Sequence, residues 1–594
     1  MNYCASPYFY RRRLTREVVV GDPHRGGVII GGRHPVMKQS MLTCDTMDTE
    51  ACVKQTLDLV EAGCQLVRIT APTVKDAANL RNIVEKLRAQ NCFVPICADI
   101  HFKPEAALEA ARWVEKIRIN PGNFVDKKKF EVREYDDATY FAEMDRIEEV
   151  FAPLVRLCKE LGRAMRIGTN HGSLSDRILN RYGDTPMGMV ESALEFARVA
   201  RRLDFHNFCF SMKASNPKVM IECYRLLVEK LEKLGPDWNY PVHLGVTEAG
   251  EGEDGRIKSA IGIGSLLCDG IGDTIRVSLT EDSPHEIPVC TDLIAQTPEL
   301  TAPLPPVAMP EWAFTTWPVD PFNYQRRVTA EVEVGFGLKC GGEHPIRVIV
   351  PRNVYQQVAP RLRPQDDVRP EGIYEDLLVW EVDPRESLQV PDDTHLVTVK
   401  DNLPLPAISA FRLLAGRLQE AGRRNPILLK DCLAPPAAAL SPARVLVASA
   451  TVLGSLLADG IGDAIMVRHE PGAGASLRLA YNILQAVGSR SFKTDYVACP
   501  SCGRTLFNLQ TVTARIKART EHLKGVKIAI MGCIVNGPGE MADADFGYVG
   551  GGPGKVNLYV GKKPVRFNIP EAEAVDQLVA LIKEHGKWRE PDAA

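Results

Sequence analysis

The sequence predicts an α/β protein with three parts: a (β/α)8 TIM barrel, a degenerate barrel-like middle domain and a C-terminal α/β domain. Three observations predict this architecture. Short β-type runs recur through the first 280 residues, glycine-rich motifs from that region recur later in the chain, and three cysteines gather near the C-terminus. Most of the β-type runs are followed by a helix-like stretch, which is typical of parallel βα units.

The barrel prediction depends on eight β-type runs that end in polar or charged residues. They cover residues 36–40, 66–70, 95–101, 116–123, 165–173, 208–215, 242–250 and 274–279. Seven intervals separate Gln39 from Arg276, and their mean length is about 34 residues, which suits a (β/α)8 barrel of ordinary size. We therefore expect a substrate-binding TIM-barrel domain over residues 1–296.

The carboxyl ends of barrel strands are where functional residues lie. Four arginines and one lysine occur at such ends on separate strands, and surface ion pairs do not readily explain five of them together. Their natural counter-ion is a multiply charged anion such as a diphosphate, which guanidinium groups bind bidentately. The carboxylates among them would orient these cations or transfer protons. The candidate residues are Gln39, Arg68, Asp99, His101, Arg118, Asn120, Arg166, Asn170, Lys213, Glu248, Arg276 and Ser278.

The segment after the barrel contains a linker and an internal repeat. Residues 297–325 are rich in Pro and Thr and predict a linker. Residues 454–467 then repeat 264–277, and residues 341–346 repeat 31–36, with much less chain between the two motifs. This spacing predicts a shortened relative of the barrel over residues 326–490.

The repeated segment has lost the polar strand ends of the barrel. Gln39 aligns with Ile349, and Arg276 aligns with Met466. A copy that keeps its packing motifs and loses its polar residues is expected to be structural. We therefore interpret residues 326–490 as a spacer.

The C-terminal cysteines predict a metal or cluster site. Most of the 16 cysteines stand singly in apolar runs, as buried side chains do in a reducing compartment. Cys499 and Cys502 form the one Cys-x-x-Cys of the chain, and Cys533 follows a short apolar run before a turn rich in Gly and Pro. Such a turn lets backbone approach a cluster closely. Helices near 509–522 and 570–583 complete a small α/β domain at residues 491–594.

Several of these motifs closely resemble the 4-hydroxy-3-methylbut-2-en-1-yl diphosphate synthase family of the methylerythritol phosphate route to isoprenoids. They are ADIHF, RINPGN, TEAG, SAIGIGSLL, DGIGDTIRVSL, ACPSC and GCIVNGPGE, within residues 15–290 and 490–560. Residues 326–490 look like the extra middle domain of the family's long, three-domain form. The resemblance implies an oxidoreductase that opens the ring of 2-C-methyl-D-erythritol 2,4-cyclodiphosphate, with two electrons from ferredoxin or flavodoxin.

The resemblance also implies the cofactor and the roles of site residues. Three thiolates and one carboxylate would hold a [4Fe–4S] cluster, namely Cys499, Cys502, Cys533 and Glu540. A carboxylate exchanges more readily than a thiolate, which leaves the fourth iron accessible to substrate. Asn536 would face the substrate, and the barrel cations would hold its diphosphate. Glu248 and His101 would transfer protons.

Composition and charge narrow the class of protein. The 75 acidic and 72 basic side chains give a net charge of −3, which argues against a partner such as nucleic acid or a membrane surface. The longest nearly apolar run, residues 445–458, is too short to span a bilayer. No secretory signal is visible at the start. We therefore expect a cytoplasmic enzyme, and a homodimer is compatible with the sequence.

Two other interpretations account for part of the sequence. A pterin-binding methyl transferase shares the barrel and an anionic ligand, but it does not require the cysteine-bearing domain. A non-catalytic protein with a structural zinc site would use the three thiols, but such sites usually close with four Cys or His ligands, and no fourth ligand of that kind is well placed near Cys533.

Overall fold

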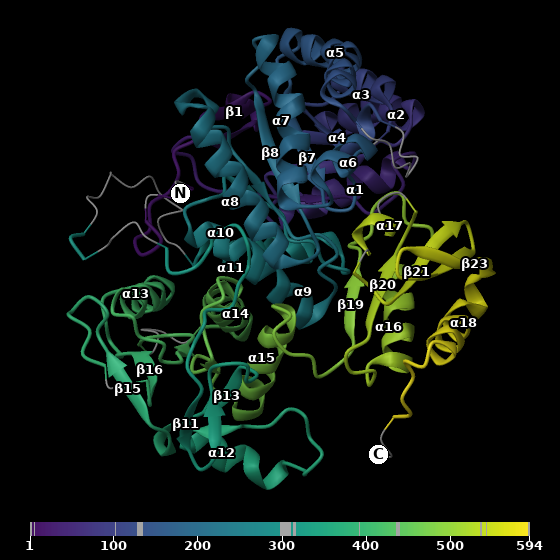
Figure 1. Cartoon of the computed structure of the whole chain (residues 1–594). Coiled ribbons are helices and arrows are strands. Elements are labelled where there is room, and N and C mark those ends of the chain that lie inside the picture. Colours follow the sequence, from purple (N-terminus) through teal and green to yellow (C-terminus); the bar gives the residue numbers. More distant parts are fainter. Residues whose placement is uncertain are drawn as a thin grey trace.

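The computed structural model describes residues 3–4, 6–100, 102–126, 135–296, 310–312, 317–390, 393–434, 440–534, 537–541 and 543–591. Its helices and strands form three groups, which Figure 1 shows as a purple-to-teal barrel, a green middle part and a yellow C-terminal part. The predicted fold class is confirmed. None of the helices in the described ranges is both long and apolar enough to cross a membrane.

Eight parallel strands form the barrel. They are β3 (Met37–Met41), β4 (Leu66–Thr70), β5 (Ile96–Asp99), β6 (Lys116–Ile119), β7 (Ala164–Asn170), β8 (Phe208–Lys213), β9 (His243–Leu244) and β10 (Thr274–Ile275). They follow the order β8-β7-β6-β5-β4-β3-β10-β9, and a parallel bridge between Phe210 and Val242 joins the two ends. Each predicted β-type run thus overlaps a strand. The run at 116–123 extends too far, because a short helix, α4 (Pro121–Phe124), begins directly after Asn120.

Helices cover the outside of the barrel, and a hairpin covers its end at the amino ends of the strands. The helices are α1 (Thr49–Glu61), α2 (Val74–Ala89), α3 (Pro104–Ala111), α5 (Asp137–Glu160), α6 (Asp176–Tyr182), α7 (Pro186–Arg202), α8 (Pro217–Leu234), α9 (Gly252–Ser259), α10 (Ser265–Cys268) and α11 (Glu286–Ile294). The hairpin consists of β1 (Glu17–Val20) and β2 (Val28–Gly31). Its Val18 and Ile30 pack against Met37 and Leu66 at the amino ends of the strands. Among the described residues, the hairpin thus covers the amino ends of the strands, and the carboxyl ends remain for a ligand.

The middle part repeats the order of six neighbouring barrel strands. It contains β11 (Val332–Gly335), β12 (Leu338–Cys340), β13 (Arg347–Val350), β14 (Gly372–Ile373), β15 (Val379–Val382), β16 (Leu396–Val399), β17 (Leu428–Lys430) and β18 (Ala464–Met466), with α12 (Arg352–Val358), α13 (Ala407–Glu420), α14 (Pro442–Ala458) and α15 (Ala473–Ala486). Its strands follow the order β14-β13-β18-β17, and β15 pairs with β16. A bridge from Val397 to Ile427 joins the two sheets. Among the described residues, β5 and β6 have no counterpart here.

Matching contacts relate the barrel to the middle part. In the barrel, Thr15 Oγ1 donates to Asp273 Oδ1 at 2.9 Å. In the middle part, Thr329 Oγ1 donates to Asp463 Oδ1 at the same distance. Each threonine also accepts a hydrogen bond from the second glycine of its Gly-Gly motif. The sequence repeat therefore reflects a repeated structure around the first and last strands.

A buried network of four charges joins the two copies. Arg225 of α8 binds Asp269 at 2.9 Å and Asp459 at 2.8 Å. Arg412 of α13 binds the same two carboxylates, at 2.7 and 2.8 Å. The two aspartates occupy equivalent positions in the repeated motifs at 264–277 and 454–467. The interface therefore has an approximate twofold arrangement within one chain.

Asp269→Ala is expected to lower the free energy of unfolding by about 3–5 kcal/mol, because each arginine would keep only one carboxylate in a buried setting. Urea unfolding of this variant measures the loss. Glu253→Ala removes one carboxylate of a partly exposed pair with Arg478 and is expected to cost at most about 1 kcal/mol. Equal losses in the two variants would contradict this interpretation of the interface.

The C-terminal part is a five-stranded sheet with two helices, α16 (Leu509–Thr520) and α18 (Glu571–Glu584), on one face. Its strands are β19 (Asp495–Ala498), β20 (Lys527–Met531), β21 (Phe546–Gly552), β22 (Lys555–Val560) and β23 (Lys563–Pro570), paired in that order. Side chains of α16 and α18 pack in one hydrophobic cluster with the sheet. Both helices lie where the sequence predicts them. The short α17 (Gly537–Glu540) follows β20.

The C-terminal part docks on the barrel of its own chain. Ala498, at the end of β19, forms a parallel bridge with Ala249, and Thr280 Oγ1 donates to Cys499 O at 3.1 Å. Gly172 of the barrel and Gly539 of α17 pack backbone to backbone. A Cβ on Gly172 would lie 2.2 Å from Gly539 O, so neither position accommodates a side chain.

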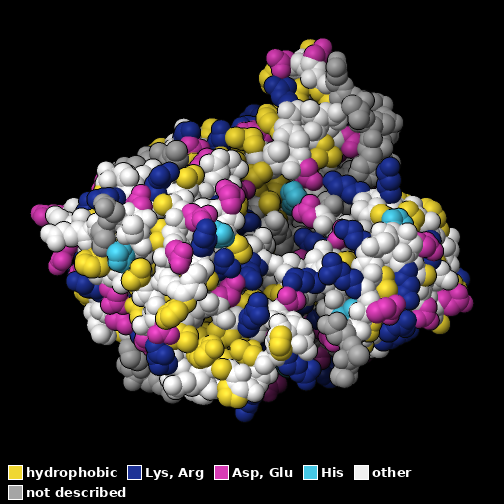
Figure 2. Space-filling view, turned by 60° about the horizontal axis from the view of Figure 1, so that its bottom comes forward, with side chains coloured by type: hydrophobic (Ala, Val, Ile, Leu, Met, Phe, Trp, Pro, Cys, Tyr) yellow, Lys and Arg dark blue, Asp and Glu magenta, His cyan; other side chains and the backbone are white. Residues whose placement is uncertain are grey.

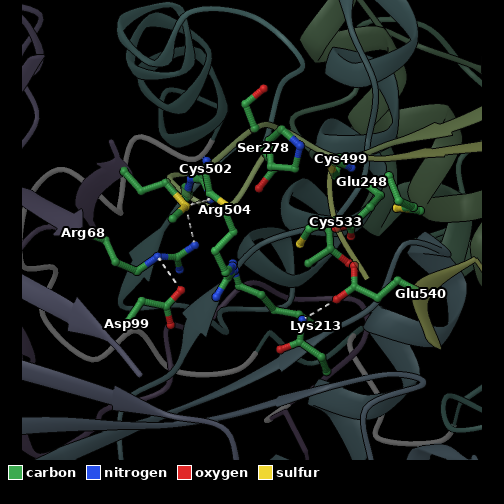
Figure 3. Close-up of a pocket in the computed structure, with 18 of the residues that line it drawn as sticks. Arg68, Asp99, Lys213, Glu248, Ser278, Cys499, Cys502, Arg504, Cys533 and Glu540 are labelled. Carbon is green, nitrogen blue, oxygen red and sulfur yellow. Dashed lines mark hydrogen bonds and ion pairs between the residues drawn. The ribbon is translucent and has the colours of Figure 1, made fainter. Parts of the chain in front are cut away.

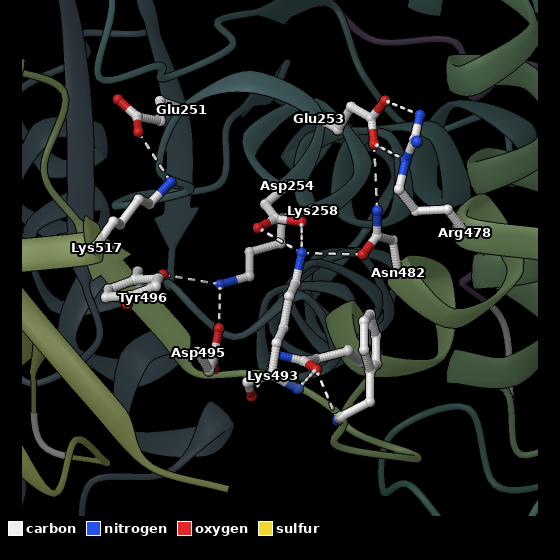
Figure 4. Close-up of polar contacts among 12 residues, drawn as sticks. Glu251, Glu253, Asp254, Lys258, Arg478, Asn482, Lys493, Asp495, Tyr496 and Lys517 are labelled. Atoms are coloured by element: carbon white, nitrogen blue, oxygen red, sulfur yellow. Dashed lines mark hydrogen bonds and ion pairs between the residues drawn. The ribbon is translucent and has the colours of Figure 1, made fainter. Parts of the chain in front are cut away.

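Ion pairs hold all three parts together beside this contact (Figure 4). The acidic start of α9 binds one cation from each of three segments. The pairs are Glu251–Lys517 of α16 at 2.9 Å, Glu253–Arg478 of α15 at 3.2 Å and Asp254–Lys493 of the connecting segment at 2.8 Å. Lys258 Nζ adds a contact to Asp495 at 2.9 Å. The middle part thus anchors the segment that carries the chain from α15 to β19.

Candidate active site

A cavity lies between the barrel mouth and the C-terminal part (Figure 3). It brings together strand ends from across the barrel and two loops of the C-terminal sheet. The sequence-predicted residues that line it are Arg68, Asp99, Arg118, Arg166, Asn170, Lys213, Glu248, Arg276, Ser278, Cys499, Cys502, Cys533 and Glu540. Arg68 and Glu540, which are 472 positions apart in sequence, therefore meet at one place.

Two predicted site residues within the described ranges, Gln39 and Asn120, do not line the cavity. Gln39 donates from Nε2 to Thr274 Oγ1 at 2.6 Å inside the barrel wall. The Asn120 side chain accepts a hydrogen bond from Gly122 N at 3.2 Å and caps α4. Both side chains are thus engaged with neighbouring barrel elements. His101 and Asn536 lie outside the described residues.

The structure adds residues that the strand-end analysis missed. They include Met41, Thr247, Ser501 and Arg504. Arg504 contributes a guanidinium from the C-terminal part, two residues after Cys502. The sequence could have indicated Arg504 through its position two residues after the Cys-x-x-Cys. The direction of its side chain, however, depends on how the C-terminal part docks on the barrel.

Buried carboxylates and an amide orient some of the barrel cations. Arg118 donates to Asp99 Oδ1 at 2.9 Å and to Asn170 Oδ1 at 2.7 Å. Arg68 lies 3.7 Å from the other oxygen of Asp99. Arg276 binds both oxygens of the buried Glu286, at 2.9 and 3.0 Å. These pairs fix the guanidinium planes before a ligand arrives.

Positive charge still exceeds negative charge in the cavity. Arg166 is 1% exposed, and its Nε and Nη1 have no hydrogen-bond partner among the described residues. Burial lowers the pKa of Arg68 to about 9. The positive charges of Arg166 and Arg276 lower it further, and the negative charge of Asp99 raises it in part. Burial and four neighbouring arginines also lower the pKa of Lys213 well below its usual range. Such a site favours a multiply charged anion.

The three cysteines lie at one edge of the C-terminal sheet. Cys499 directly follows β19 and Cys533 follows β20, and these parallel neighbours end side by side. Ser501 takes a left-handed backbone with φ of 57°, which folds Cys502 back toward Cys499. Gly532 N donates to Cys499 Sγ at 3.2 Å. Burial raises the pKa of Cys499, and the nearby Glu248, Cys502 and Cys533 raise it further. The thiols therefore form one close group.

Two glutamates face each other across the domain contact. Asn170 Nδ2 donates to Glu540 Oε1 at 2.6 Å, so the barrel positions this carboxylate of α17. The Oε2 atoms of Glu540 and Glu248 are buried and have no hydrogen-bond partner among the described residues. Burial, followed by the charge of Glu540, raises the pKa of Glu248 well above its usual range. Glu248 also has a left-handed backbone with φ of 51°, a strain that clusters at functional sites.

The donor set fits a cluster better than a single metal ion. Across the described ranges, no three His, Cys, Asp or Glu side chains converge as one ion requires. A zinc ion needs its ligands around one point. In a four-iron cluster each protein ligand meets a different iron, so three thiols and a carboxylate with an unpartnered oxygen need only line the same cavity.

Comparison with known proteins agrees with both parts of the site. Residues 15–291 match the family model of the GcpE TIM-barrel domain, and residues 495–584 match that of the GcpE protein C-terminal domain.

Curated relatives match the chain along its whole length. A 4-hydroxy-3-methylbut-2-en-1-yl diphosphate synthase (flavodoxin) from Akkermansia muciniphila is 58% identical, with 99% of each chain covered. The enzyme of the same name from Leptospira interrogans is 45% identical, again over 99% of each chain. A chloroplastic ferredoxin form from Oryza sativa is 41% identical over 99% of this chain and 89% of its own length. The resemblance in the sequence motifs is thereby confirmed, and the chain belongs to the GcpE family of 4-hydroxy-3-methylbut-2-en-1-yl diphosphate synthases.

Proposed function

We propose that this chain catalyses the reductive dehydroxylation and ring opening of 2-C-methyl-D-erythritol 2,4-cyclodiphosphate to 4-hydroxy-3-methylbut-2-enyl diphosphate. One observation carries the proposal: a buried group of cations and three clustered cysteines line the same cavity. An anion that the barrel binds therefore lies beside the cysteines. The relatives are named for flavodoxin or ferredoxin, so a small redox protein of one of these kinds supplies the electrons.

The residues proposed to hold the cofactor, a [4Fe–4S] cluster, are Cys499, Cys502, Cys533 and Glu540. When bound there, the cluster supplies the electrons that the reductive ring opening needs. Asn170 donates to one oxygen of Glu540, and the other oxygen is buried without a hydrogen-bond partner among the described residues. The pterin-binding interpretation is not favoured, because it gives these four residues no role.

The barrel cations bind and orient the diphosphate. Two nitrogens of Arg166 and the Oγ of Ser278 are buried without a hydrogen-bond partner among the described residues, so they are available to phosphate oxygens. Asp99 holds Arg118 in place while the substrate binds. The interaction of planar guanidinium groups with phosphate oxygens is bidentate, so it fixes the orientation of the ring toward the cysteines.

Glu248 is the proposed proton donor. The departing hydroxyl leaves as water, so it needs a proton as the carbon–oxygen bond breaks. Glu248 lies in the cavity beside Glu540, and burial favours its protonated form. The partner role suggested for His101, and the substrate contact suggested for Asn536, remain proposals that rest on the family resemblance.

Binding of the diphosphate is expected to take up a proton at Lys213. The neighbouring arginines hold the pKa of this amine down in the free protein, and the bound phosphates would raise it again. Affinity should therefore rise as the pH falls from the pKa of the bound state to the lowered pKa of the free protein, and should level off below that. Calorimetry in buffers of different ionisation enthalpy measures the uptake. Lys213→Met should abolish it, and an uptake unchanged in that variant would contradict the assignment.

The middle part is proposed to be a spacer that makes each chain self-sufficient. We assign residues 1–296 to the substrate-binding barrel, 297–325 to a linker, 326–490 to the spacer and 491–594 to the cluster domain. The support is that α15 leads into a segment whose Lys493 binds Asp254 of the barrel, which returns β19 to the mouth of the same chain. We place the reaction in the cytoplasm, where thiols stay reduced.

The direct test of the function is an anaerobic turnover assay. Purified, iron-loaded protein is mixed with the cyclodiphosphate and a chemically reduced flavodoxin or ferredoxin. Formation of the allylic diphosphate supports the proposal. Absence of product from protein that contains its full iron complement would overturn it.

A further inference from the structure

Met41 lies between two arginines of the barrel mouth. It is the last residue of β3, and the order of the sheet places β3 between β4, which carries Arg68, and β10, which Arg276 follows directly. Arg68 Nη2 donates to Met41 Sδ at 2.8 Å, and Arg276 Nη1 donates to the same sulfur at 2.9 Å. One uncharged side chain is therefore the shared acceptor of two cations from opposite sides.

The two arginines depend on this sulfur to different degrees. Arg276 uses Nε and Nη2 to bind Glu286, so Met41 receives the remaining nitrogen of its guanidinium group. Arg68 is held less firmly, because its Nε lies 3.7 Å from Asp99 Oδ2 and has no hydrogen-bond partner among the described residues (Figure 3). Within the described ranges, the thioether is the one hydrogen-bond acceptor of the Arg68 side chain. Loss of the sulfur is therefore expected to affect Arg68 most.

The sulfur is held in a fixed place. Met41 is buried and lines the cavity. Ser283 Oγ donates to Met41 O at 2.7 Å, and Leu42 N donates to Arg68 O at 2.9 Å, so the end of β3 is tied on both sides. A side chain on the end of a scaffold strand orients its partners more precisely than one on a loop.

A thioether suits this position because it carries no charge. Asp99 and Glu286 each cancel part of the positive charge that a diphosphate needs, and a third carboxylate would cancel more. A thioether is a weak acceptor, and its polarizable, apolar body fills the space between the guanidinium groups. It thus restricts their orientations in advance and leaves both charges available to an anion.

A fixed orientation matters more for these two arginines than for cations on the surface. Figure 2 shows Lys and Arg side chains gathered around a hollow on the outer face, where water and salt screen them. Arg68 and Arg276 are buried instead, and the positive charge of Arg276 contributes to the lowered pKa of Arg68. Without an acceptor between them, this repulsion would favour orientations that turn the two guanidinium groups apart.

We propose that Met41 is a positioning residue, whose sulfur holds the guanidinium groups of Arg68 and Arg276 in the arrangement that binds the diphosphate. It acts through these arginines and not on the reacting atoms. The inference rests on the proposed function, because it concerns the same anion. The alternative is that Met41 only fills space, as buried methionines do. The two roles differ in whether the acceptor or the volume of the side chain matters.

Three variants of the anaerobic, iron-loaded, full-length protein separate these roles. Met41→Leu keeps the apolar volume but removes the acceptor, and Met41→Gln restores an acceptor on an unbranched side chain. Met37→Leu is the matched control, because Met37 is a buried residue of the same strand that packs at the amino ends and does not line the cavity. Calorimetry with inorganic pyrophosphate measures affinity, turnover of the cyclodiphosphate gives KM and kcat, and urea unfolding measures stability.

Met41→Leu is expected to bind pyrophosphate about two- to tenfold more weakly, with a similar rise in KM, a smaller change in kcat and a stability close to that of Met37→Leu. Met41→Gln should recover most of the affinity. Wild-type affinity in Met41→Leu, or an equal loss in Met41→Leu and Met41→Gln, would overturn the inference. A wild type that binds pyrophosphate in a Met41-dependent manner but gives no turnover would instead overturn the proposed function.

Discussion

Cys533→Ser is expected to abolish both turnover and the visible absorption of the cluster while the protein stays folded. The residue follows β20 at the edge of the sheet, next to Cys499, and a serine hydroxyl is a poor ligand for iron at this position. Iron analysis and the visible spectrum of anaerobically purified protein measure the loss.

The matched control for this variant is Cys97→Ser. Cys97 packs among Met37, Leu66 and Ala164 near the amino ends of the strands and does not line the cavity, so its replacement should cost stability but leave the iron content unchanged. Full iron content in Cys533→Ser would show that this residue is not a cluster ligand.

Arg166→Met is expected to weaken substrate binding about ten- to a hundred-fold without loss of stability. Removal of a buried guanidinium with two unpartnered nitrogens relieves repulsion among the barrel cations, so the free energy of unfolding should stay equal or rise. The substrate dependence of turnover and urea unfolding measure the two effects.

Arg276→Met separates binding from stability. Arg276 also lines the cavity, but it binds both oxygens of Glu286, which is 1% exposed. Its removal leaves that carboxylate buried without its partner and is expected to destabilise the protein by about 3–5 kcal/mol. Similar unfolding curves for the Arg166 and Arg276 variants would contradict the view that Arg166 contributes to anion binding and not to stability.

The barrel could be predicted because its signals are local. Each β-type run is apolar, ends in a polar residue and recurs at a regular spacing, and parallel strands place all those ends at one mouth. The limit of this reasoning is side-chain direction. Asn120 stands at a strand end but turns to cap α4, and Gln39 turns into the barrel wall. Their neighbours on adjacent strands reach the cavity.

The remaining features depend on contacts between distant segments. The hairpin of β1 and β2 has a weak sequence pattern, and its position is fixed by packing against the amino ends of the barrel strands. Arg504 belongs to the site only because Gly503 packs against Cys44 and Thr70, more than 400 positions earlier in the sequence. No local pattern of residues near the Cys-x-x-Cys encodes that contact.

The central claim is that one chain holds a complete active site, and mixing two inactive chains tests it most directly. A Cys533→Ser chain keeps the barrel cations, and an Arg166→Met chain keeps the cluster ligands. They are combined under conditions where subunits exchange, at a substrate concentration too low for the Arg166→Met chain alone. Because the cluster domain docks on its own barrel, no activity is expected to return. Substantial recovery would mean that sites are shared between chains and would contradict the account.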